Sequence, residues 1–499
     1  MKPALHILAV PNDDGFGPSA LLSYVVKAVL ARRPDSRATL WNRSRVDYNR
    51  NLYRDLVAAG RVNVEPTANL IELAKDASTG NVSIAGTLAG IGDYRAASDR
   101  YAAGTGAGGF NLVLECGVPA VARWAAKRGV PCVGIFDHAW ARTLEMILTT
   151  AIQKTKPLTP TLSPRRGERE KNPGSLNAPL NTEVIADLKN SFPLPIGWGE
   201  GQGEGQFLPH KHGLDDSIAP VTARQRAQWR KLVAAVSRDE AFTRKLFLFP
   251  DFISPPLFRS HWRRVAPRAV VRRFSGVLGG GSSWSERQAR EYLGLAKPGR
   301  IVMIQGGDTP AWDTLLQRLV FALLDAGAEL EARRLNVALY VPRRIACRGA
   351  VARLNHPAVA RQCPRVRAFA PVPGGTMQEI FPFVDLLVTR AGGGTVNDAV
   401  ACRTPFVCVR ERGHSQVEAI HATCLKRGLT REVDSAALEA DPLGTILAEL
   451  DRTRDHRAMV AVMRKIPNHA EEKLAREILR EFTAQRVSSG VCRRRPRPS

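Results

Sequence analysis

The chain has 499 residues, a length that predicts two or three domains and excludes a small module held by disulfides. Its net charge is +25, with 44% hydrophobic and 24% charged residues, a basic globular composition that excludes global disorder. No apolar run approaches the roughly 18 residues of a spanning helix, and the N-terminus carries no signal-peptide cleavage site. The eight cysteines form no C-x-x-C pair, which favours reduced thiols. We therefore expect a cytoplasmic protein that can touch the inner face of a membrane as a peripheral protein but does not cross it.

Strands alternate with helices along the first half of the chain. Short apolar runs predict buried strands at residues 5–10, 38–41, 112–115, 131–136 and 270–277. Helical spacing of apolar residues predicts helices at 19–32 and 118–128. This alternation is typical of a parallel sheet covered on both faces.

The second half repeats the pattern. Strands are predicted at 300–304, 336–341, 366–369, 385–389 and 406–409, and helices at 312–324, 395–402 and 470–482. Glycines at 279–281, followed by two serines, predict a flexible boundary between the halves.

One segment, residues 154–206, fits neither half because it is rich in Pro and Gly and lacks periodicity. Its ends contain LTPTLSP (158–164) and WGEGQGEG (198–205). The reverse complement of DNA that encodes LTPTLSP encodes RGEGRGE, a sequence similar to the second segment. We expect an inverted repeat inserted in frame and tolerated as a surface loop, since closure entropy grows slowly with loop length. The alternative is a functional lid.

The positive charge is concentrated in two segments. Residues 221–275 hold 13 Lys and Arg against three acids, and residues 486–499 hold five arginines and no acid. Such clusters predict attraction to an anionic surface, either phospholipid head groups or nucleic acid. The alternative is a genome whose base composition favours arginine.

The clearest motif is TRAGGGTVNDAVACRTP (389–405), where Gly392, Gly393 and Gly394 separate a predicted strand from a predicted helix. Glycines there let the backbone approach a ligand, and the free N–H groups of the helix N-terminus favour phosphate. The alternative is a tight turn without a ligand.

The run from 365 to 428 resembles the donor-binding domain of GT-B glycosyltransferases. The likeness is to family 28, which includes the bacterial N-acetylglucosaminyl transferase of peptidoglycan synthesis. The segments that carry it, in the family's order, are Phe369 with the turn after it, MQEIFPF (377–383), VDLLVTRAGGGTVNDAVACRTPFVCV (384–409) and GHSQVEAIHA (413–422). The resemblance implies an α/β fold with two Rossmann-like doubly wound domains facing a cleft. It also implies a terminal helix that docks back on the body.

The resemblance assigns donor-binding roles by position. Asp398, where the family usually has Glu, would accept the ribose hydroxyls, and the donor sugar would meet the loop with His414. An alternative for His414 is a capping role. The full donor-binding set that the resemblance implies is Phe369 and Ala370 at the base, Gly306, Gly307, Gly392, Gly393, Gly394 and Thr395 at the diphosphate, Asp398 at the ribose, and His414, Gln416 and Glu418 at the sugar.

The general base is less clear from the sequence. Gly15 to Pro18 resembles the glycine loop of GT-B acceptor domains, but Pro18 stands where related enzymes often place His. The candidates are Asp13 or Asp14 in that loop, and Asp137 or His138 at the end of a predicted strand. The alternative is that Asp137 and His138 only cap the next helix.

These observations predict a domain at 1–278 interrupted by 154–206, a donor domain at 284–467, a terminal helix at 468–485 and a disordered basic tail at 486–499.

The implied function is inverting transfer of a sugar from a nucleotide diphosphate sugar, UDP-linked, to a hydroxyl. No metal and no cofactor are expected. The acceptor is not identified; a lipid-linked acceptor would suit the basic segment, and no nucleic acid is expected. One alternative is an epimerase of the same fold. A second is a binding protein without catalysis, in view of Pro18, of Asp398, and of Asp308, whose carboxylate beside Gly306 and Gly307 would repel a diphosphate. A third is a nucleic-acid binder.

Overall fold

The computed structural model describes residues 4–12, 17–43, 45–67, 70–71, 73–74, 82–103, 109–135, 139–154, 221–306, 310–340, 354–369, 376–411 and 414–492. Contacts divide the chain into one unit that holds both sheets, Met1–Thr155 with Asp216–Ser499, and a second unit, Lys156–Asp215. The predicted insertion overlaps this second unit. Apart from Lys154, it lies outside the described residues.

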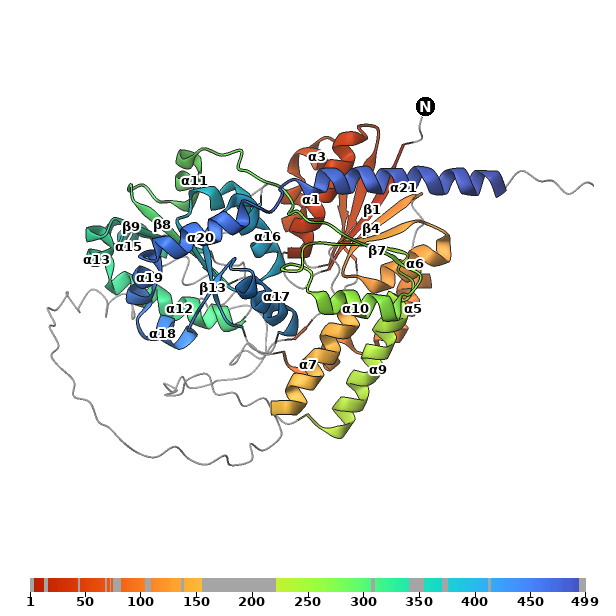
Figure 1. Cartoon of the computed structure of the whole chain (residues 1–499), viewed down its shortest axis with the longest axis horizontal. Helices are drawn as coiled ribbons and strands as arrows, with labels where there is room; N and C mark the ends of the chain where they lie inside the picture. Colours follow the sequence, from red (N-terminus) through yellow and green to blue (C-terminus); the bar gives the residue numbers. More distant parts are fainter. Residues whose placement is uncertain are drawn as a thin grey trace, which may run out of the picture. The chain divides into compact units, whose positions relative to one another are not determined.

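The first sheet has seven parallel strands in the order β3-β2-β1-β4-β5-β6-β7 (Figure 1). The strands are β1 (His6–Pro11), β2 (Arg37–Trp41), β3 (Val62–Glu65), β4 (Leu112–Cys116), β5 (Cys132–Ile135), β6 (Lys245–Leu248) and β7 (Val270–Arg273). The helices of this half are α1 (Gly17–Arg32), α2 (Val46–Leu52), α3 (Arg54–Ala58), α4 (Ile84–Ile91), α5 (Tyr94–Ala103), α6 (Pro119–Arg128), α7 (Trp140–Lys154), α9 (Ala223–Glu240) and α10 (Pro256–Val265).

Both faces of the first sheet are buried at its central strand β1, as expected for a parallel sheet with helices on both sides. In β1, Ile7 and Ala9 belong to the core cluster that contains Val25 of α1. Leu8 and Val10 belong to a separate cluster with Trp124 of α6.

The second sheet has six parallel strands in the order β10-β9-β8-β11-β12-β13. Its strands are β8 (Arg300–Gln305), β9 (Leu335–Tyr340), β10 (Val366–Phe369), β11 (Leu386–Thr389), β12 (Phe406–Val409) and β13 (Arg431–Val433). Its helices are α11 (Glu286–Leu293), α12 (Pro310–Asp325), α13 (Gly327–Ala332), α15 (Pro357–Gln362), α16 (Gly393–Cys402), α17 (Ser415–Lys426), α18 (Ser435–Ala440), α19 (Pro442–Leu450) and α20 (Thr453–Met463), with 3-10 turns η1 (Met377–Glu379) and η2 (Phe381–Phe383).

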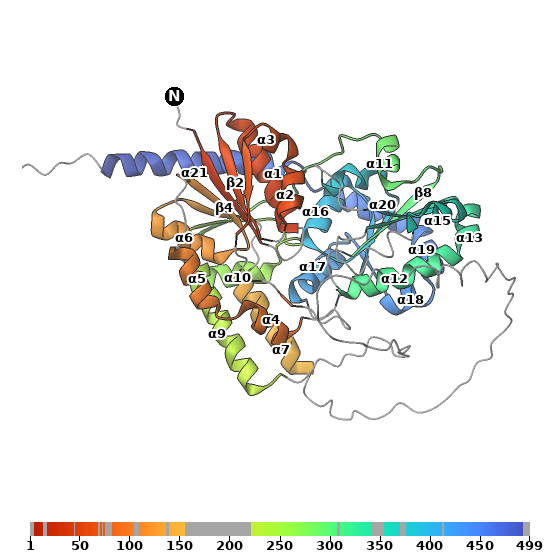
Figure 2. The ribbon, with the colours of Figure 1, turned by 180° about the vertical axis from the view of Figure 1, so that it is seen from behind.

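The terminal helix α21 (Ala470–Cys492) packs along α1 of the first half, and Figures 1 and 2 show the two helices side by side. Leu474 and Ile478 of α21 are fully buried in the same cluster as Val25. The helix continues to Cys492, so residues 486–492, predicted as part of a disordered tail, are helical. Residues 493–499 lie outside the described part of the chain.

The glycine-rich connection between the halves is held by hydrogen bonds, in contrast to the flexible boundary that the sequence predicted. The amide of Gly279 donates to Glu471 Oε2 at 2.8 Å, and the amide of Gly280 donates to Gln378 Oε1 at 3.0 Å. Gly279 has a φ of +73°, and a Cβ there would stand 2.2 Å from Gln378 Oε1. Glycine is needed at this position because the chain passes close to another segment, which leaves the connection little freedom.

Candidate functional site

In both sheets, the strand order reverses beside the first strand of that half, between β1 and β4 and between β8 and β11. Ligands of doubly wound sheets bind at the carboxyl ends of the strands at such a switch point. Gln305 ends β8 and Thr389 ends β11, and the Thr389 hydroxyl donates to the Gln305 carbonyl oxygen at 2.6 Å. The glycine motif follows directly after Thr389, so it lies at the switch point.

The glycine motif forms the start of α16. Gly392 is its N-cap, with extended φ and ψ of −73° and 134°, and no side chain caps the helix there. The first turn contains no acidic residue. The N–H groups of Gly393, Gly394 and Thr395 are therefore among those that a helix N-terminus leaves without an intrahelical partner.

The first turn of α16 meets the first turn of α1. A Cβ on Gly394 would stand 2.9 Å from the Cα of Gly17, and a Cβ on Gly17 would stand 3.6 Å from the amide nitrogen of Gly394. The first turn of α1 also lacks an acidic residue. Each helix N-terminus carries a partial positive charge of about +0.5, so bringing the two together favours an anion beside them.

Two buried polar atoms near these turns have no hydrogen-bond partner among the described residues. Ser19 Oγ belongs to the first turn of α1, and Gln305 Oε1 belongs to the last residue of β8. The Gln305 amide nitrogen lies 3.5 Å from Thr395 Oγ1 of α16. Unpaired buried polar atoms are costly, so these two are available to a ligand.

Asp398 lies one turn further along α16 and is buried. Its Oδ1 accepts hydrogen bonds from Gln378 Nε2 at 2.9 Å and from Asn397 Nδ2 at 3.1 Å. The Tyr24 hydroxyl of α1 lies 3.2 Å from the same oxygen. Burial raises the pKa of Asp398 to about 6, and these three hydrogen bonds partly offset that rise.

A buried ion pair joins the loops after β11 and β12. Arg390 Nη1 lies 2.6 Å from Glu411 Oε2, with side-chain exposures of 15% and 5%. Because the carboxylate neutralises this arginine, Arg390 adds little to the attraction that the positive ends of the helices exert on an anion.

The predicted donor-sugar loop leads into α17. His414 is buried and caps this helix, since its Nδ1 accepts from the Val417 amide at 3.5 Å. The next residue, Ser415, donates from its hydroxyl to the carbonyl oxygen of Thr143 in α7 at 3.4 Å. Gln416 is buried in the first turn of α17. The loop therefore contacts the helix that follows Asp137 and His138 in the sequence.

The N-terminus of α7 is capped by a side chain that is distant in the sequence. Glu240, the last residue of α9, accepts a hydrogen bond from the Ala141 amide at 3.0 Å through Oε1, while its Oε2 lies 2.6 Å from His261 Nε2. Both side chains are buried, and burial raises the pKa of Glu240. The first turn of α7 thus has a carboxylate partner in Glu240.

Several predicted site residues lie outside the described residues: Asp13, Asp137, His138, Gly307 and Ala370. Gly306 is described, and a Cβ there would stand 1.9 Å from the Trp312 ring. The need for glycine at 306 is thus explained by packing against Trp312. The Phe369 ring packs against Tyr340 with ring centroids 5.5 Å apart. Glu418 lies in the first turn of α17 and is half-buried.

Comparison with solved structures identifies the architecture. The glycotransferase of kitacinnamycin has a TM-score of 0.53 and 13% identity, over 96% of this chain and 100% of that one. LpCGTa, solved in complex with UDP, has a TM-score of 0.51 and 11% identity, over 96% and 100% of the two chains. The chain has the GT-B fold. No protein-family model matches the sequence, and no curated protein matches it.

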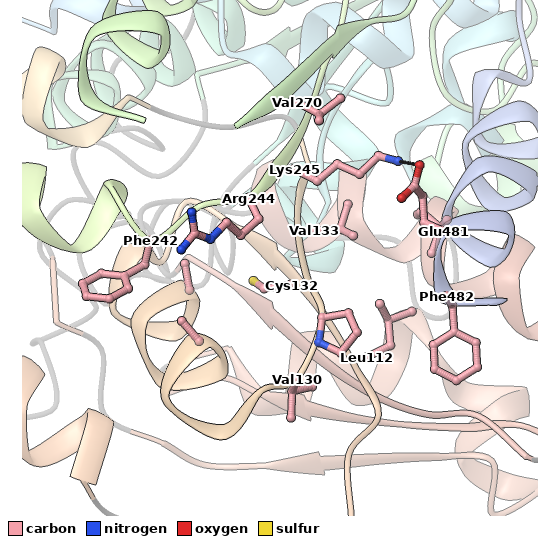
Figure 3. Close-up of a pocket in the computed structure, with 14 residues that line it drawn as sticks. Leu112, Val130, Cys132, Val133, Phe242, Arg244, Lys245, Val270, Glu481 and Phe482 are labelled. Carbon is pink, nitrogen blue, oxygen red and sulfur yellow. Dashed lines mark ion pairs between the residues drawn. The ribbon is translucent and has the colours of Figure 1, made fainter. Parts of the chain in front are cut away.

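Two hollows in the GT-B body lie away from the switch points. One, of about 160 Å³, opens beside the first residues of β4, β5, β6 and β7, where Lys245 pairs with Glu481 of α21 (Figure 3). The other, of about 360 Å³, lies among α5, α6 and α9. Parallel sheets bind ligands at the carboxyl ends of their strands, so neither hollow is a candidate for the donor.

The described residues contain no group of three or more His, Cys, Asp or Glu side chains placed to hold a metal ion. In the same residues, no helix is long and apolar enough to cross a membrane.

Sequence reasoning missed Ser19, Tyr24, Gln305 and Gln378 at this site. Gln378 stands inside a segment that the resemblance singled out, and Gln305 directly precedes the predicted Gly306 and Gly307, so their side-chain amides were a readable signal. Ser19 and Tyr24 stand in an ordinary helical pattern, which carried no such signal.

Proposed function

We propose that this protein is a glycosyltransferase that moves a sugar from a nucleotide diphosphate sugar, UDP-linked, to a hydroxyl acceptor. The observation that carries the proposal is the meeting, at Gly17 and Gly394, of two helix N-termini whose first turns contain no acidic residue. Two helix N-termini that meet at a switch point are suited to hold an anion with two phosphate groups, such as the diphosphate of a nucleotide sugar. The unpaired atoms of Ser19 and Gln305 support the same position.

The donor is proposed to lie along the carboxyl edge of the second sheet. The diphosphate is placed at the start of α16, and Asp398 one turn later is placed at the ribose. Gln416 and Glu418 at the start of α17 are placed at the sugar. The nucleobase of the donor is placed at the backbone after β10, beside Phe369 and Ala370.

The proposed reaction is a single displacement. The acceptor hydroxyl loses its proton to His138, oriented by Asp137, or to Asp13, and its oxygen attacks the anomeric carbon. The bond from that carbon to the diphosphate oxygen breaks, and the released negative charge is stabilised by the N-termini of α1 and α16 without a metal ion. Because one displacement occurs, the configuration at the anomeric carbon inverts.

The names of the structural neighbours support this chemistry without establishing it here. One is a glycotransferase of kitacinnamycin, and another was solved with UDP. Both share only the fold at their level of identity. The choice of donor and acceptor for this chain therefore rests on the site.

A thermal-shift screen of nucleotide diphosphates and nucleotide sugars tests the proposal, because a ligand that binds only the folded protein raises its Tm. The Ser19→Ala variant should bind the best ligand about tenfold more weakly, as expected for a lost hydrogen bond to a charged group. Ser23→Ala is the matched control, since the Ser23 hydroxyl of the same helix already donates to the Ala20 carbonyl oxygen at 2.7 Å. Equal affinities in both variants would contradict the placement of the diphosphate.

Product analysis separates transfer from the alternatives. An epimerase would convert the sugar with the donor alone, whereas a transferase needs an acceptor. A binding protein without catalysis would show the thermal shift and no product with any acceptor offered.

We further propose that the acceptor is lipid-linked and that the protein works as a peripheral protein on the cytoplasmic face of a membrane. The neighbouring helices α9 and α10 expose Arg224, Arg230, Lys231, Arg259 and Arg263. Clusters of this kind are attracted to anionic lipid at about 1 kcal/mol per basic residue.

A further inference from the structure

Asp398 and four other polar side chains form a hydrogen-bonded network. The Oδ1 atom of Asp398 accepts hydrogen bonds from Gln378 Nε2 at 2.9 Å, from Asn397 Nδ2 at 3.1 Å and from the Tyr24 hydroxyl at 3.2 Å. The Tyr24 hydroxyl also lies 2.6 Å from Thr376 Oγ1. Asp398, Gln378 and Asn397 are each at most 5% exposed. With three donors on one oxygen, that atom has no capacity left for a ligand hydroxyl.

The two amides of the network also hold the connection between the halves. The Leu278 carbonyl oxygen accepts from Gln378 Nε2 at 2.8 Å and from Asn397 Nδ2 at 3.1 Å. The Leu278 amide donates to Asn397 Oδ1 at 2.8 Å. Both N–H groups of each amide are therefore committed, one to Asp398 and one to the connection. A change in the partners of Asp398 bears directly on how firmly the connection is held.

Tyr24 differs from the other members because it comes from α1 of the first half, 374 residues from Asp398 in the sequence. Burial and the charge of Asp398 both raise the pKa of Tyr24, so the phenol keeps its proton and remains a donor at neutral pH. A phenol hydroxyl and a ribose hydroxyl offer a carboxylate the same O–H donor.

We propose that Tyr24 sets the donor affinity by occupying, in the ligand-free protein, the place on Asp398 that a ribose hydroxyl takes in the complex. The inference rests on the proposed function, which assigns Asp398 to the ribose. A ribose hydroxyl and the Tyr24 hydroxyl compete for this place on Oδ1. A donor that takes this place needs the bridge from α1 to α16 to open, so its apparent affinity is reduced by the fraction of molecules that remain bridged.

The consequence is unusual for a site residue: removing its hydroxyl strengthens binding. In Tyr24→Phe the ring still fills its place in the core, but Asp398 loses one donor and the bridged state loses its hydrogen bond to the carboxylate. Affinity for UDP should rise about three- to tenfold, the range expected for one hydrogen bond that favours the unoccupied state. A merely structural role for Tyr24 would lower the affinity or leave it unchanged.

The matched control is Tyr53→Phe. Tyr53 lies in the same half and is buried, but its hydroxyl has no hydrogen-bond partner among the described residues. Loss of that hydroxyl should leave UDP binding unchanged. The control thus separates the specific contact with Asp398 from the general effect of removing a buried phenol oxygen.

Isothermal titration with UDP on the full-length wild type, Tyr24→Phe, Tyr53→Phe and Asp398→Ala tests the inference. Hydrogen exchange of the ligand-free proteins is measured in parallel. Tighter UDP binding in Tyr24→Phe alone, with faster amide exchange at the start of α16, is the expected result.

Unchanged or weaker UDP binding in Tyr24→Phe, with weaker binding in Asp398→Ala, would overturn the role of Tyr24 and leave the proposed function standing. Unchanged binding in Asp398→Ala would overturn the ribose assignment itself. No UDP binding by any of the four proteins, with unchanged exchange at α16 in Tyr24→Phe, would overturn both the role of Tyr24 and the UDP-linked donor.

Discussion

Gly17 and Gly394 face each other so closely that a Cβ on Gly394 would stand 2.9 Å from the Cα of Gly17. The neighbouring atom belongs to the backbone, so it cannot swing aside as the end of a flexible side chain would. The two glycines therefore set the distance between the first turns of α1 and α16. In the proposed function, that distance decides how a diphosphate is held between them.

Replacing Gly394 with Ala should push the two turns apart and destabilise the protein by about 1 to 3 kcal/mol, the usual range for overpacking. Gly90→Ala is the control, because Gly90 lies within α4 with nothing within 4 Å of its Cβ position. That change should stabilise the helix by about 0.5 to 1 kcal/mol. Urea unfolding of both variants measures the difference. Equal stability of Gly394→Ala and wild type would show that the turns are free to separate.

The burial of Asp398 should make the stability depend on pH. Its pKa is raised to about 6 in the folded protein, above an unfolded value of about 3.9, so the folded state binds more protons between these pH values. The stability should therefore be greatest below about pH 4 for this group and fall as the pH rises to about 6, by at most about 3 kcal/mol.

The variant Asp398→Asn isolates this effect because it keeps an oxygen acceptor for Gln378, Asn397 and Tyr24 and cannot ionise. The difference in unfolding free energy between wild type and variant, measured from pH 4.5 to 7.5, should change in favour of the variant as the pH rises. A difference that stays constant with pH would mean that the carboxylate is well solvated.

The general base should be found at residues 137 and 138. Once an acceptor is known, His138→Ala should lower kcat about 100- to 10,000-fold, as loss of a general base does, and Asp13→Ala should lower it less. Donor affinity should change little in His138→Ala, because the base acts on the acceptor. Normal turnover in His138→Ala would move the base to the first loop.

The sequence predicted the fold class correctly, since the apolar runs at β1, β4, β8 and β11 are continuous and lie next to glycine turns. It missed β3, β6 and β13. The strands β3 and β13 are short edge strands, VNVE and REV, in which polar residues interrupt the apolar pattern. The strand β6, KLFL, lies inside the first sheet, but it has only four residues and begins with a lysine. A strand that is only partly covered has no reason to be apolar throughout, so its sequence carries little signal.

The site was predictable where it is local in the chain and unpredictable where it is assembled by the fold. The glycine motif and Asp398 stand within one segment, and a motif search finds them together. The contact of Tyr24 with Asp398 and the capping of Ala141 by Glu240 join residues 374 and 99 positions apart. Nothing in a helical pattern marks Tyr24 as a partner of a distant carboxylate.

Residues 156–215 should be dispensable for the fold. They form a unit separate from the one that holds both sheets, and α7 is described up to Lys154 on the preceding side. Replacing residues 156–215 with a short glycine linker should leave the Tm and the binding of UDP unchanged, since long insertions cost little closure entropy. Loss of soluble protein on deletion would show instead that the segment is integrated into a core.

The exposed basic residues of α9 and α10 should attach the protein reversibly to anionic lipid. Each contributes about 1 kcal/mol near such a surface, and the attraction fades within about 8 Å at physiological ionic strength. Sedimentation with phosphatidylserine-containing and neutral vesicles measures this attachment, with residues 493–499 removed because their arginines could bind independently.

The reversal Arg259→Glu with Arg263→Glu on α10 should lower sedimentation at least about tenfold at the same contribution per charge. The matched control reverses Arg454 and Arg457, which are exposed on α20 of the other half. An equal loss in both double variants would mean that net charge alone governs attachment. Sedimentation that is equal with both lipids, or absent with both, would favour a soluble acceptor.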